Sequence, residues 1–275
     1  MKKIQLSSFL SIVGIGSDSG LVFKHNSLFI ISDNASFLYQ FDILQNKLKR
    51  IPLVENPQEN IPKKSKYDFE SISLKGNKLH IFGSGSTSKR EKRIIYNLEN
   101  EAIAEKDLSK LYRQLKQTCS ITDDELNIEG ALFYNEKWYL FQRGNGANSK
   151  NGIFIINEKF NDDGDIEFIP IQLPKIQHIE TTFTDAILVG DKIYFLATAE
   201  NTTSTYADGE ILGSLIGRID TQTMKIDFTQ KISDSHKFEG LTLYNKTEDK
   251  IEFLLCEDND SDILETNIYE LILRN

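Results

Sequence analysis

Cysteine is scarce in this chain of 275 residues, which contains only Cys119 and Cys256. The two residues are far apart in the sequence and form no metal-binding spacing, so we expect two unpaired thiols in a reducing compartment. The four histidines share no spacing either, and the sequence contains no nucleophile elbow. The sequence therefore gives no support to a disulfide scaffold, a zinc site or a Ser-His-Asp hydrolase.

Long apolar runs are also missing. No stretch reaches the roughly 18 consecutive apolar residues that span a membrane, so we expect no membrane partner. The N-terminal segment MKKIQLSSFLSIVGIG is similar to a signal peptide in its two lysines, but glutamine and serine residues interrupt its apolar part. We therefore expect a cytoplasmic protein, and a leader that has been removed or has degenerated stays open.

Basic residues are in deficit, with 32 lysines and arginines against 41 aspartates and glutamates and a formal net charge of −9. Binding to nucleic acid depends on a basic face that neutralises phosphates. The sequence therefore predicts no nucleic-acid partner. A surplus of acids suits solubility, and it also suits cation binding wherever carboxylates converge.

One segment pattern organises the chain. In Asn127–Asn145, NIEGALFYNEKWYLFQRGN, an acid and a glycine precede a strand, and a short turn, a second apolar strand and a polar tip follow. This pattern occurs five times, at intervals of 51 to 59 residues. The marker residues that open the five copies are Ser19, Glu70, Glu129, Asp185 and Glu239.

Repeats of this length with several strands each are typical of a β-propeller. A third strand is expected after each tip, at Phe37–Ile43, Arg93–Leu98, Gly152–Asn157, Leu215–Asp220 and Asn267–Leu273. A fourth strand follows in most copies, at Lys47–Leu53, Ile166–Leu173 and Lys225–Ile232. The last copy lacks a fourth strand, and Lys3–Leu6 would supply it and close the ring. The sequence thus predicts an all-β, five-bladed propeller with four antiparallel strands per blade, forming a single domain over residues 1–275 and a monomer.

One segment departs from the blade pattern. Asp107–Thr118, DLSKLYRQLKQT, has apolar residues at i, i+3, i+4 and i+7, which predicts a short inserted helix that covers the side of the propeller. Glu55–Tyr67 and Glu200–Ser214 are longer than a connection requires. The first of these loops is either a lid over the tips or a solvated edge.

The five markers should converge, because the first strand of each propeller blade lines the central channel. Four carboxylates in a narrow channel raise one another's pKa and cannot all stay ionised without a counter-charge. A calcium ion, which accepts about six to eight oxygen ligands, would supply that charge. The alternative is that each acid accepts backbone N–H groups of the adjacent blade and acts as a staple between blades.

The five copies together resemble the calcium-activated nucleotidases, the soluble apyrases. The stretches that carry the resemblance are Ser19-Gly20-Leu21, Phe69-Glu70-Ser71, Ile128-Glu129-Gly130 with Phe141-Gln142-Arg143, Thr184-Asp185-Ala186, and Phe238-Glu239-Gly240. The resemblance implies a five-bladed propeller with one calcium ion in the central channel, and it carries the calcium positions of that family onto the five markers. The fourth position is a serine in the family and Asp185 here.

The tips differ from those of the nucleotidases. Ser32-Asp33-Asn34 offers one acid and no arginine where the family has two acids and an arginine, and the Gly-Ser loop Gly83–Arg90 replaces a Lys-Glu-Trp segment. These features more closely resemble an uncharacterised bacterial propeller family, and more distantly the phytase-like esterase propellers. The resemblance therefore supports the fold and the calcium ion rather than nucleotide hydrolysis.

The tips also predict a pocket for a small anion. Arg143 and Arg90 would clamp a phosphate or carboxylate group, unless they pair with acids of neighbouring tips. Asp33 would act as the general base that activates a water molecule near the metal, with Glu200 and Asp258 as alternatives. Two functions stay open: a calcium-dependent hydrolase of phosphate esters or nucleotides, and a noncatalytic propeller whose structural calcium supports binding of a ligand or protein.

Overall fold

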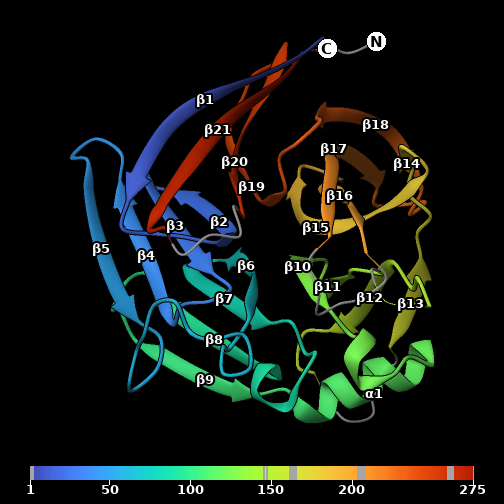
Figure 1. Cartoon of the computed structure of the whole chain (residues 1–275), viewed down its shortest axis with the longest axis horizontal. Coiled ribbons are helices and arrows are strands. Elements are labelled where there is room, and N and C mark those ends of the chain that lie inside the picture. Colours follow the sequence, from blue (N-terminus) through green and yellow to red (C-terminus); the bar gives the residue numbers. More distant parts are fainter. Residues whose placement is uncertain are drawn as a thin grey trace.

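Five antiparallel sheets stand around a central axis in the computed structural model, which describes residues 3–144, 146, 148–160, 166–202, 209–258 and 263–274 (Figure 1). Four of the sheets have four strands, and the fifth has the same four with one further strand of two residues. This arrangement confirms the five-bladed β-propeller that the repeat predicts.

In blades 1 to 3 the strands follow one another outward from the axis in chain order (Figure 1). Blade 1 contains β2 (Asp18–Lys24), β3 (Ser27–Ser32), β4 (Phe37–Asp42) and β5 (Lys47–Pro52). Blade 2 contains β6 (Phe69–Lys75), β7 (Lys78–Gly83), β8 (Lys92–Asn97) and β9 (Ile103–Asp107). Blade 3 contains β10 (Ile128–Tyr134), β11 (Lys137–Gln142), β12 (Gly152–Asn157) and β13 (Glu167–Pro170). Blade 4 contains β14 (Lys175–Ile176), β15 (Ile179–Val189), β16 (Lys192–Asn201), β17 (Glu210–Asp220) and β18 (Ile226–Ser233).

Blade 5 joins the two ends of the chain. It contains β19 (Phe238–Lys246), β20 (Lys250–Glu257) and β21 (Glu265–Arg274), and β1 (Lys3–Val13) is its outermost strand. Strand β1 pairs antiparallel with β21, from Lys3 opposite Arg274 to Val13 opposite Glu265. The predicted closure by the N-terminal strand is confirmed, and the closing strand extends well beyond the expected Lys3–Leu6.

The hydrophobic core is divided among the five interfaces between neighbouring blades. Each interface holds one cluster of buried side chains, as between blades 3 and 4, where Phe141 and Phe195 both meet the ring of Phe183 edge to face at 5.1 Å. Because both faces of each blade are buried in this way, the inner strands read in sequence as near-continuous apolar runs.

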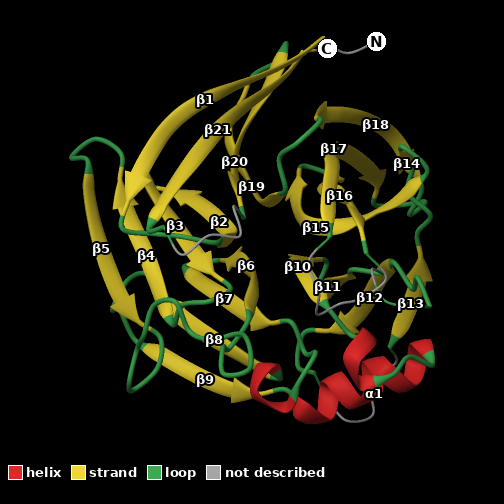
Figure 2. Cartoon of the chain, viewed as in Figure 1, coloured by secondary structure: helices red, strands yellow, loops and turns green. Residues whose placement is uncertain are grey.

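The expected helix is confirmed as α1 (Ser109–Cys119), and Figure 2 shows it on the outer side of the ring. Its apolar face packs into the cluster between blades 2 and 3, and the hydroxyl of Tyr112 donates a hydrogen bond to the carbonyl of Gly83 at 2.7 Å. Gly85 lies against this tyrosine with a φ of +82°, and a Cβ atom there would be 2.6 Å from the ring. Two 3-10 turns, Ser88–Arg90 and Asp123–Glu125, flank the helix in sequence.

Two strands have no counterpart among the expected ones. All five side chains of β9 are exposed, so its sequence IAEKD lacks the alternation that marks a strand. Strand β14 is too short to give a pattern. Cys119 and Cys256 are both buried and unpaired, as the sequence predicts. No helix in the described ranges is long and apolar enough to span a membrane.

Each inner strand contains a β-bulge near its start. The bulges fall at Ser19, Glu70, Glu129, Thr184 and Glu239. A bulge adds one residue to its strand and redirects a side chain. The bulge residue is therefore the marker itself in four blades, and in blade 4 it is Thr184, one residue before the marker Asp185.

Candidate metal and ligand site

Polar side chains occupy three equivalent positions of every blade at one end of the inner strands. The first position is the bulge residue, the second lies two residues before it, and the third faces the second from the end of the next strand. The residues at these positions, which we call the channel mouth, are Ser19, Glu70, Glu129, Thr184 and Glu239; Ser17, Asp68, Asn127, Thr182 and Lys237; and Asp33, Ser84, Arg143, Thr198 and Asp258. All are buried except Asp33, which is partly buried.

Arg143 connects three carboxylates on one side of the channel mouth. Its Nη1 lies 3.2 Å from Glu129 Oε1 and 3.6 Å from Glu239 Oε1, and its Nη2 pairs with Glu200. Asn127 donates a further hydrogen bond to Glu129 at 2.6 Å. Burial raises the pKa of Glu129, and the Arg143 guanidinium opposes that rise. These contacts show the arginine as an internal counter-charge, 4% exposed.

Lys237 extends the same network. Its Nζ lies 3.0 Å from Glu239 Oε1 and 2.9 Å from Asp258 Oδ2. Burial raises the pKa of Glu239 well above its usual range, and the Lys237 ammonium group lowers it. We call Arg143, Lys237 and the four acids they contact the Arg143 half of the channel mouth; the acids are Glu129, Glu200, Glu239 and Asp258.

The opposite side, which we call the Lys66 half, contains Asp33, Asp68 and Glu70 with Lys66 and Arg90. Lys66 Nζ pairs with Asp33 and lies 2.7 Å from Asp68 Oδ1. Arg90 Nη1 lies 2.7 Å from Asp68 Oδ2. Both cations of this half therefore contact Asp68.

Glu70 receives no such partner in the described part of the chain. One carboxylate oxygen each of Asp33, Asp68 and Glu70 lie within 4.8 Å of one another, a grouping that could hold a metal ion. Burial raises the pKa of Glu70 well above its usual range, the neighbouring carboxylates of Asp68 and Glu129 raise it further, and the Lys66 ammonium group lowers it in part. Asp33 Oδ1 is also buried without a hydrogen-bond partner among the described residues. The Lys66 half therefore contains carboxylate oxygens that could coordinate a cation.

Ser19 and Asp185 of the predicted calcium set, and Thr184 next to Asp185, form hydrogen bonds to the neighbouring blade. Ser19 donates a hydrogen bond to the Phe69 carbonyl of blade 2, and Thr184 donates one to the Phe238 carbonyl of blade 5 at 2.7 Å. Asp185 accepts from its neighbour Ala186 N at 2.7 Å and from Leu241 N of blade 5 at 2.8 Å. Asp185 thus shows the bond from an acid to a backbone N–H of the next blade that the sequence left as the alternative, whereas the two hydroxyls donate to carbonyl groups instead.

The arginines expected to clamp an anion are paired internally. Arg143 contacts acids as described, and Arg90 donates to Asp68, to Ser86 Oγ at 2.7 Å and to the Lys63 carbonyl at 2.8 Å. Glu200, the alternative base, accepts from Gly209 N at 2.7 Å besides its pair with Arg143. The ion-pair alternative therefore describes both arginines in this structure.

Acids outnumber cations across the two halves. The carboxylates are Asp33, Asp68, Glu70, Glu129, Glu200, Glu239 and Asp258, and the cations that contact them are Lys66, Arg90, Arg143 and Lys237. The protein itself supplies part of the counter-charge that the sequence assigned to calcium. The remaining excess is negative.

Four residues of the site are not among those that the sequence predicts: Asp68, Asn127, Lys237 and Lys66. A signal for the first three existed, because the position two residues before the bulge is polar in all five blades. Lys66 lies in the predicted Glu55–Tyr67 loop, which has no counterpart in the other blades, so the repeat could not reveal it. The loop brings this lysine into the channel mouth, where its side chain is 9% exposed.

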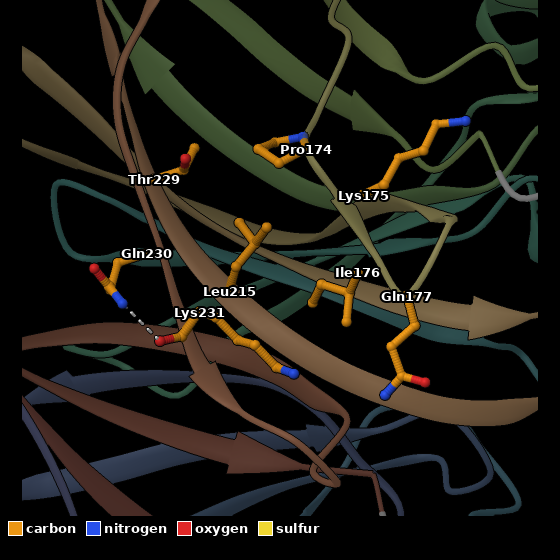
Figure 3. Close-up of a pocket in the computed structure, with 8 residues that line it drawn as sticks. All are labelled: Pro174, Lys175, Ile176, Gln177, Leu215, Thr229, Gln230 and Lys231. Carbon is orange, nitrogen blue, oxygen red and sulfur yellow. Dashed lines mark hydrogen bonds between the residues drawn. The ribbon is translucent and has the colours of Figure 1, made fainter.

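A separate pocket of about 320 Å³ lies on blade 4. Figure 3 shows Leu215 and Ile176 facing its interior, between segments of β14, β17 and β18, while the amino group of Lys175 points away. The lysines at this pocket pair with acids, Lys175 with Glu180 and Lys231 with Asp234. The pocket shares no residue with the channel mouth.

Solved structures with the same general fold cover nearly the whole chain. The chain is 11% identical to Myxococcus xanthus glutaminyl cyclase, with a TM-score of 0.55 over 98% of this chain and 97% of that one. It is 10% identical to a luciferin-regenerating enzyme, with a TM-score of 0.51 over 99% and 97%. A Bacteroides thetaiotaomicron protein of unknown function is 9% identical, with a TM-score of 0.48 over 98% and 76%. The first two likenesses, with TM-scores above 0.5, show the fold alone.

Sequence comparisons give a family without an activity. No curated protein sequence matches the chain. The sequence profile of a family of unknown function, DUF6929, matches residues 14–273.

Proposed function

Since the chain belongs to DUF6929, a family of unknown function, we propose its function from the chemistry of the channel mouth. This site binds a calcium ion beside Glu70 and presents it to a small anionic ligand. The observation behind the proposal is Glu70, which is 9% exposed, forms no ion pair within the described ranges and lies close to the carboxylates of Asp33 and Asp68. A buried charge of this kind is costly without a partner, and a bound cation supplies one.

The donor set suits a hard divalent ion. Glu70 and Oδ1 of Asp33 are the available oxygen donors, whereas Asp68 already accepts bonds from Lys66 and Arg90. Carboxylate oxygens are the ligands that calcium prefers, and its flexible coordination tolerates waters and ligand oxygens at the remaining positions. Of the five residues first expected to hold calcium, Glu70 is the one that this proposal keeps as a central ligand.

The ion also explains how an acidic site would accept an anion. Acids exceed cations at the channel mouth, so a free phosphate or carboxylate group would be repelled. A bound calcium ion reverses the local charge and offers coordination positions to ligand oxygens. Because Arg143 and Arg90 are committed to internal acids, the ion rather than an arginine clamp would make the first contact with the ligand.

A noncatalytic binding propeller fits these contacts best. A calcium-dependent hydrolase is the second candidate, and the unpartnered Oδ1 of Asp33 favours it because that atom has room to accept a proton from water. Calcium would then polarise the bond to be hydrolysed. The pairing of Asp33 with Lys66 lowers the pKa of Asp33 against the rise that burial causes, which weakens it as a base.

The test is a calcium titration by calorimetry of the wild type and of Glu70→Gln. A matched control is Glu105→Gln, which changes an exposed acid on the outermost strand of the same blade. We expect the wild type and the control to bind calcium at this site, and Glu70→Gln to lose it. Equal binding by Glu70→Gln would contradict the proposal, as would an absence of calcium binding by the wild type.

A turnover assay separates the two candidates. Nucleoside di- and triphosphates, phosphomonoesters and lactones would be offered with calcium to the wild type and to Asp33→Asn. The binding propeller predicts no turnover of any of these classes. Calcium-dependent turnover that Asp33→Asn abolishes at an unchanged melting temperature would establish the hydrolase instead.

A further inference from the structure

Lys66 is a buried cation on a surface turn. Its side chain is 9% exposed, whereas its neighbours Lys64 and Ser65 are both classed as exposed. The amino group pairs with Asp33 and lies 2.7 Å from Asp68 Oδ1. Lysine has a long flexible side chain and a strongly hydrated ammonium group, so it is seldom buried without such partners. Because its turn lies at the surface, Lys66 can return to solvent by rotation of its side chain.

The ammonium group of Lys66 shares its partners with the ion proposed beside Glu70. One carboxylate oxygen each of Asp33, Asp68 and Glu70 lie within 4.8 Å of one another. Lys66 contacts two of these three residues. Within so small a group of oxygens an ammonium group and a metal ion would repel each other strongly. The lysine and the ion would therefore compete for the same carboxylates.

The charges of the Lys66 half favour exchange over joint occupancy. Its three carboxylates, when ionised, exceed its two cations by one negative charge. A divalent ion added beside Lys66 would leave one positive charge in excess, whereas an ion that replaces Lys66 would leave the half neutral. Buried charges are costly unless they are balanced. A divalent ion therefore fits this half best when Lys66 leaves it.

Two contacts attach the turn at residues 62–66 to Asp68. Lys66 Nζ contacts Asp68 Oδ1 directly. Arg90 contacts Asp68 through Nη1 and donates through Nη2 to the Lys63 carbonyl, at 2.8 Å. Departure of Lys66 would remove the direct contact and leave the turn attached through Arg90. Occupancy of the ion site would thus change how an exposed turn is held.

We propose that Lys66 is a displaceable occupant of the calcium site, which balances the carboxylates when the ion is absent and is expelled, with release of its turn, when calcium binds. This inference rests on the proposed function and adds regulation to it. Lys66 lowers the affinity for calcium, because the ion has to break the pairs with Asp33 and Asp68 to enter. In return, the state of the buried site is displayed at the surface turn.

Amine labelling of the wild type tests the displacement directly. A short pulse of acetic anhydride followed by mass spectrometry measures how fast each lysine reacts. Without calcium, Lys66 should be protected relative to the exposed Lys64, which serves as an internal reference in the same turn. Saturation with calcium should remove this protection. Protection of Lys66 that persists in the calcium-saturated protein would overturn the inference.

Calorimetry of Lys66→Met measures the competition. This variant should bind calcium about tenfold more tightly than the wild type, a difference of about 1.4 kcal/mol, because the ion no longer has to displace a lysine. Lys66→Arg keeps the positive charge and should gain no affinity. The matched control Lys64→Met removes an exposed lysine of the same turn and should bind calcium as the wild type does. Equal or weaker binding by Lys66→Met would overturn the inference.

The displacement and the calcium site fail in different ways. A wild type that binds no calcium would contradict the proposed function itself. A wild type that binds calcium, loses it in Glu70→Gln and keeps Lys66 protected would leave the site standing and overturn the displacement alone. Should Lys66→Met fail to fold, labelling of the wild type still decides the question.

Discussion

The two halves of the channel mouth contain the same kinds of side chain, but they differ in how completely their carboxylates are paired with lysine and arginine. In the Arg143 half, every carboxylate contacts Arg143 or Lys237. In the Lys66 half, Lys66 and Arg90 both contact Asp68, and within the described ranges neither cation pairs with Glu70. An acidic ring therefore does not by itself imply a metal ion, because internal cations can neutralise its carboxylates. The informative residue is the acid that the internal cations leave unpaired.

Removal of the central cation of the Arg143 half should have the largest effect on stability. Arg143→Met leaves three buried carboxylates without their shared partner, and breaking a buried ion pair from one side costs about 3–5 kcal/mol. We expect a loss of this size in the free energy of unfolding, measured by urea denaturation at neutral pH. A loss below about 1 kcal/mol would mean that the arginine is not the counter-charge of this half.

The corresponding change in the Lys66 half should cost less. Lys66→Met leaves Arg90 on Asp68, so only Asp33 loses its cationic partner, and we expect a loss of about 2–3 kcal/mol without calcium. Calcium should recover part of that loss, because the ion can occupy the space that Lys66 leaves between Asp33 and Asp68, beside Glu70. The measurement is the same denaturation with calcium and with a chelator. An identical loss under both conditions would contradict a cation site in this half.

Neutralising one acid in each half should give opposite signs. Glu129→Gln weakens the contact with Arg143 and should destabilise the protein, whereas Glu70→Gln removes an unpaired charge and should stabilise the calcium-free protein by about 1 kcal/mol near pH 8. The folded-state pKa of Glu70 lies above its unfolded value, so its ionisation costs stability as pH rises from about 4.5 through that raised pKa. The gain from Glu70→Gln should therefore vanish near pH 4. Destabilisation by Glu70→Gln at pH 8 in chelator would show that its carboxylate has an internal partner.

The staple residues should give the smallest effects. Thr184→Val removes the hydrogen bond to the Phe238 carbonyl and should cost about 1 kcal/mol in the free energy of unfolding. Because this hydroxyl bonds to backbone, calcium affinity should stay unchanged in calorimetry. A lower calcium affinity in this variant would place Thr184 among the ligands.

The fold could be predicted because each blade repeats the same local pattern, and closure by the N-terminal strand followed from the incomplete last copy. In blade 4, Thr184-Asp185-Ala186 contains the acid and small residue of the pattern, shifted by one position relative to the bulge. Lys66 could not be predicted, since its loop lies outside the repeat. A counter-charge that arrives from such a loop depends on tertiary structure, so the repeat pattern could not show it.

Anomalous diffraction from a crystal grown with calcium would locate any ion bound at the channel mouth. The account predicts a calcium peak in the Lys66 half, bound by Glu70 and by Oδ1 of Asp33, with Arg143 still paired to Glu129. A channel mouth without a peak and with Lys66 still between Asp33 and Asp68 would contradict it. A peak bound by Glu129 and Glu239 in the Arg143 half would contradict it equally.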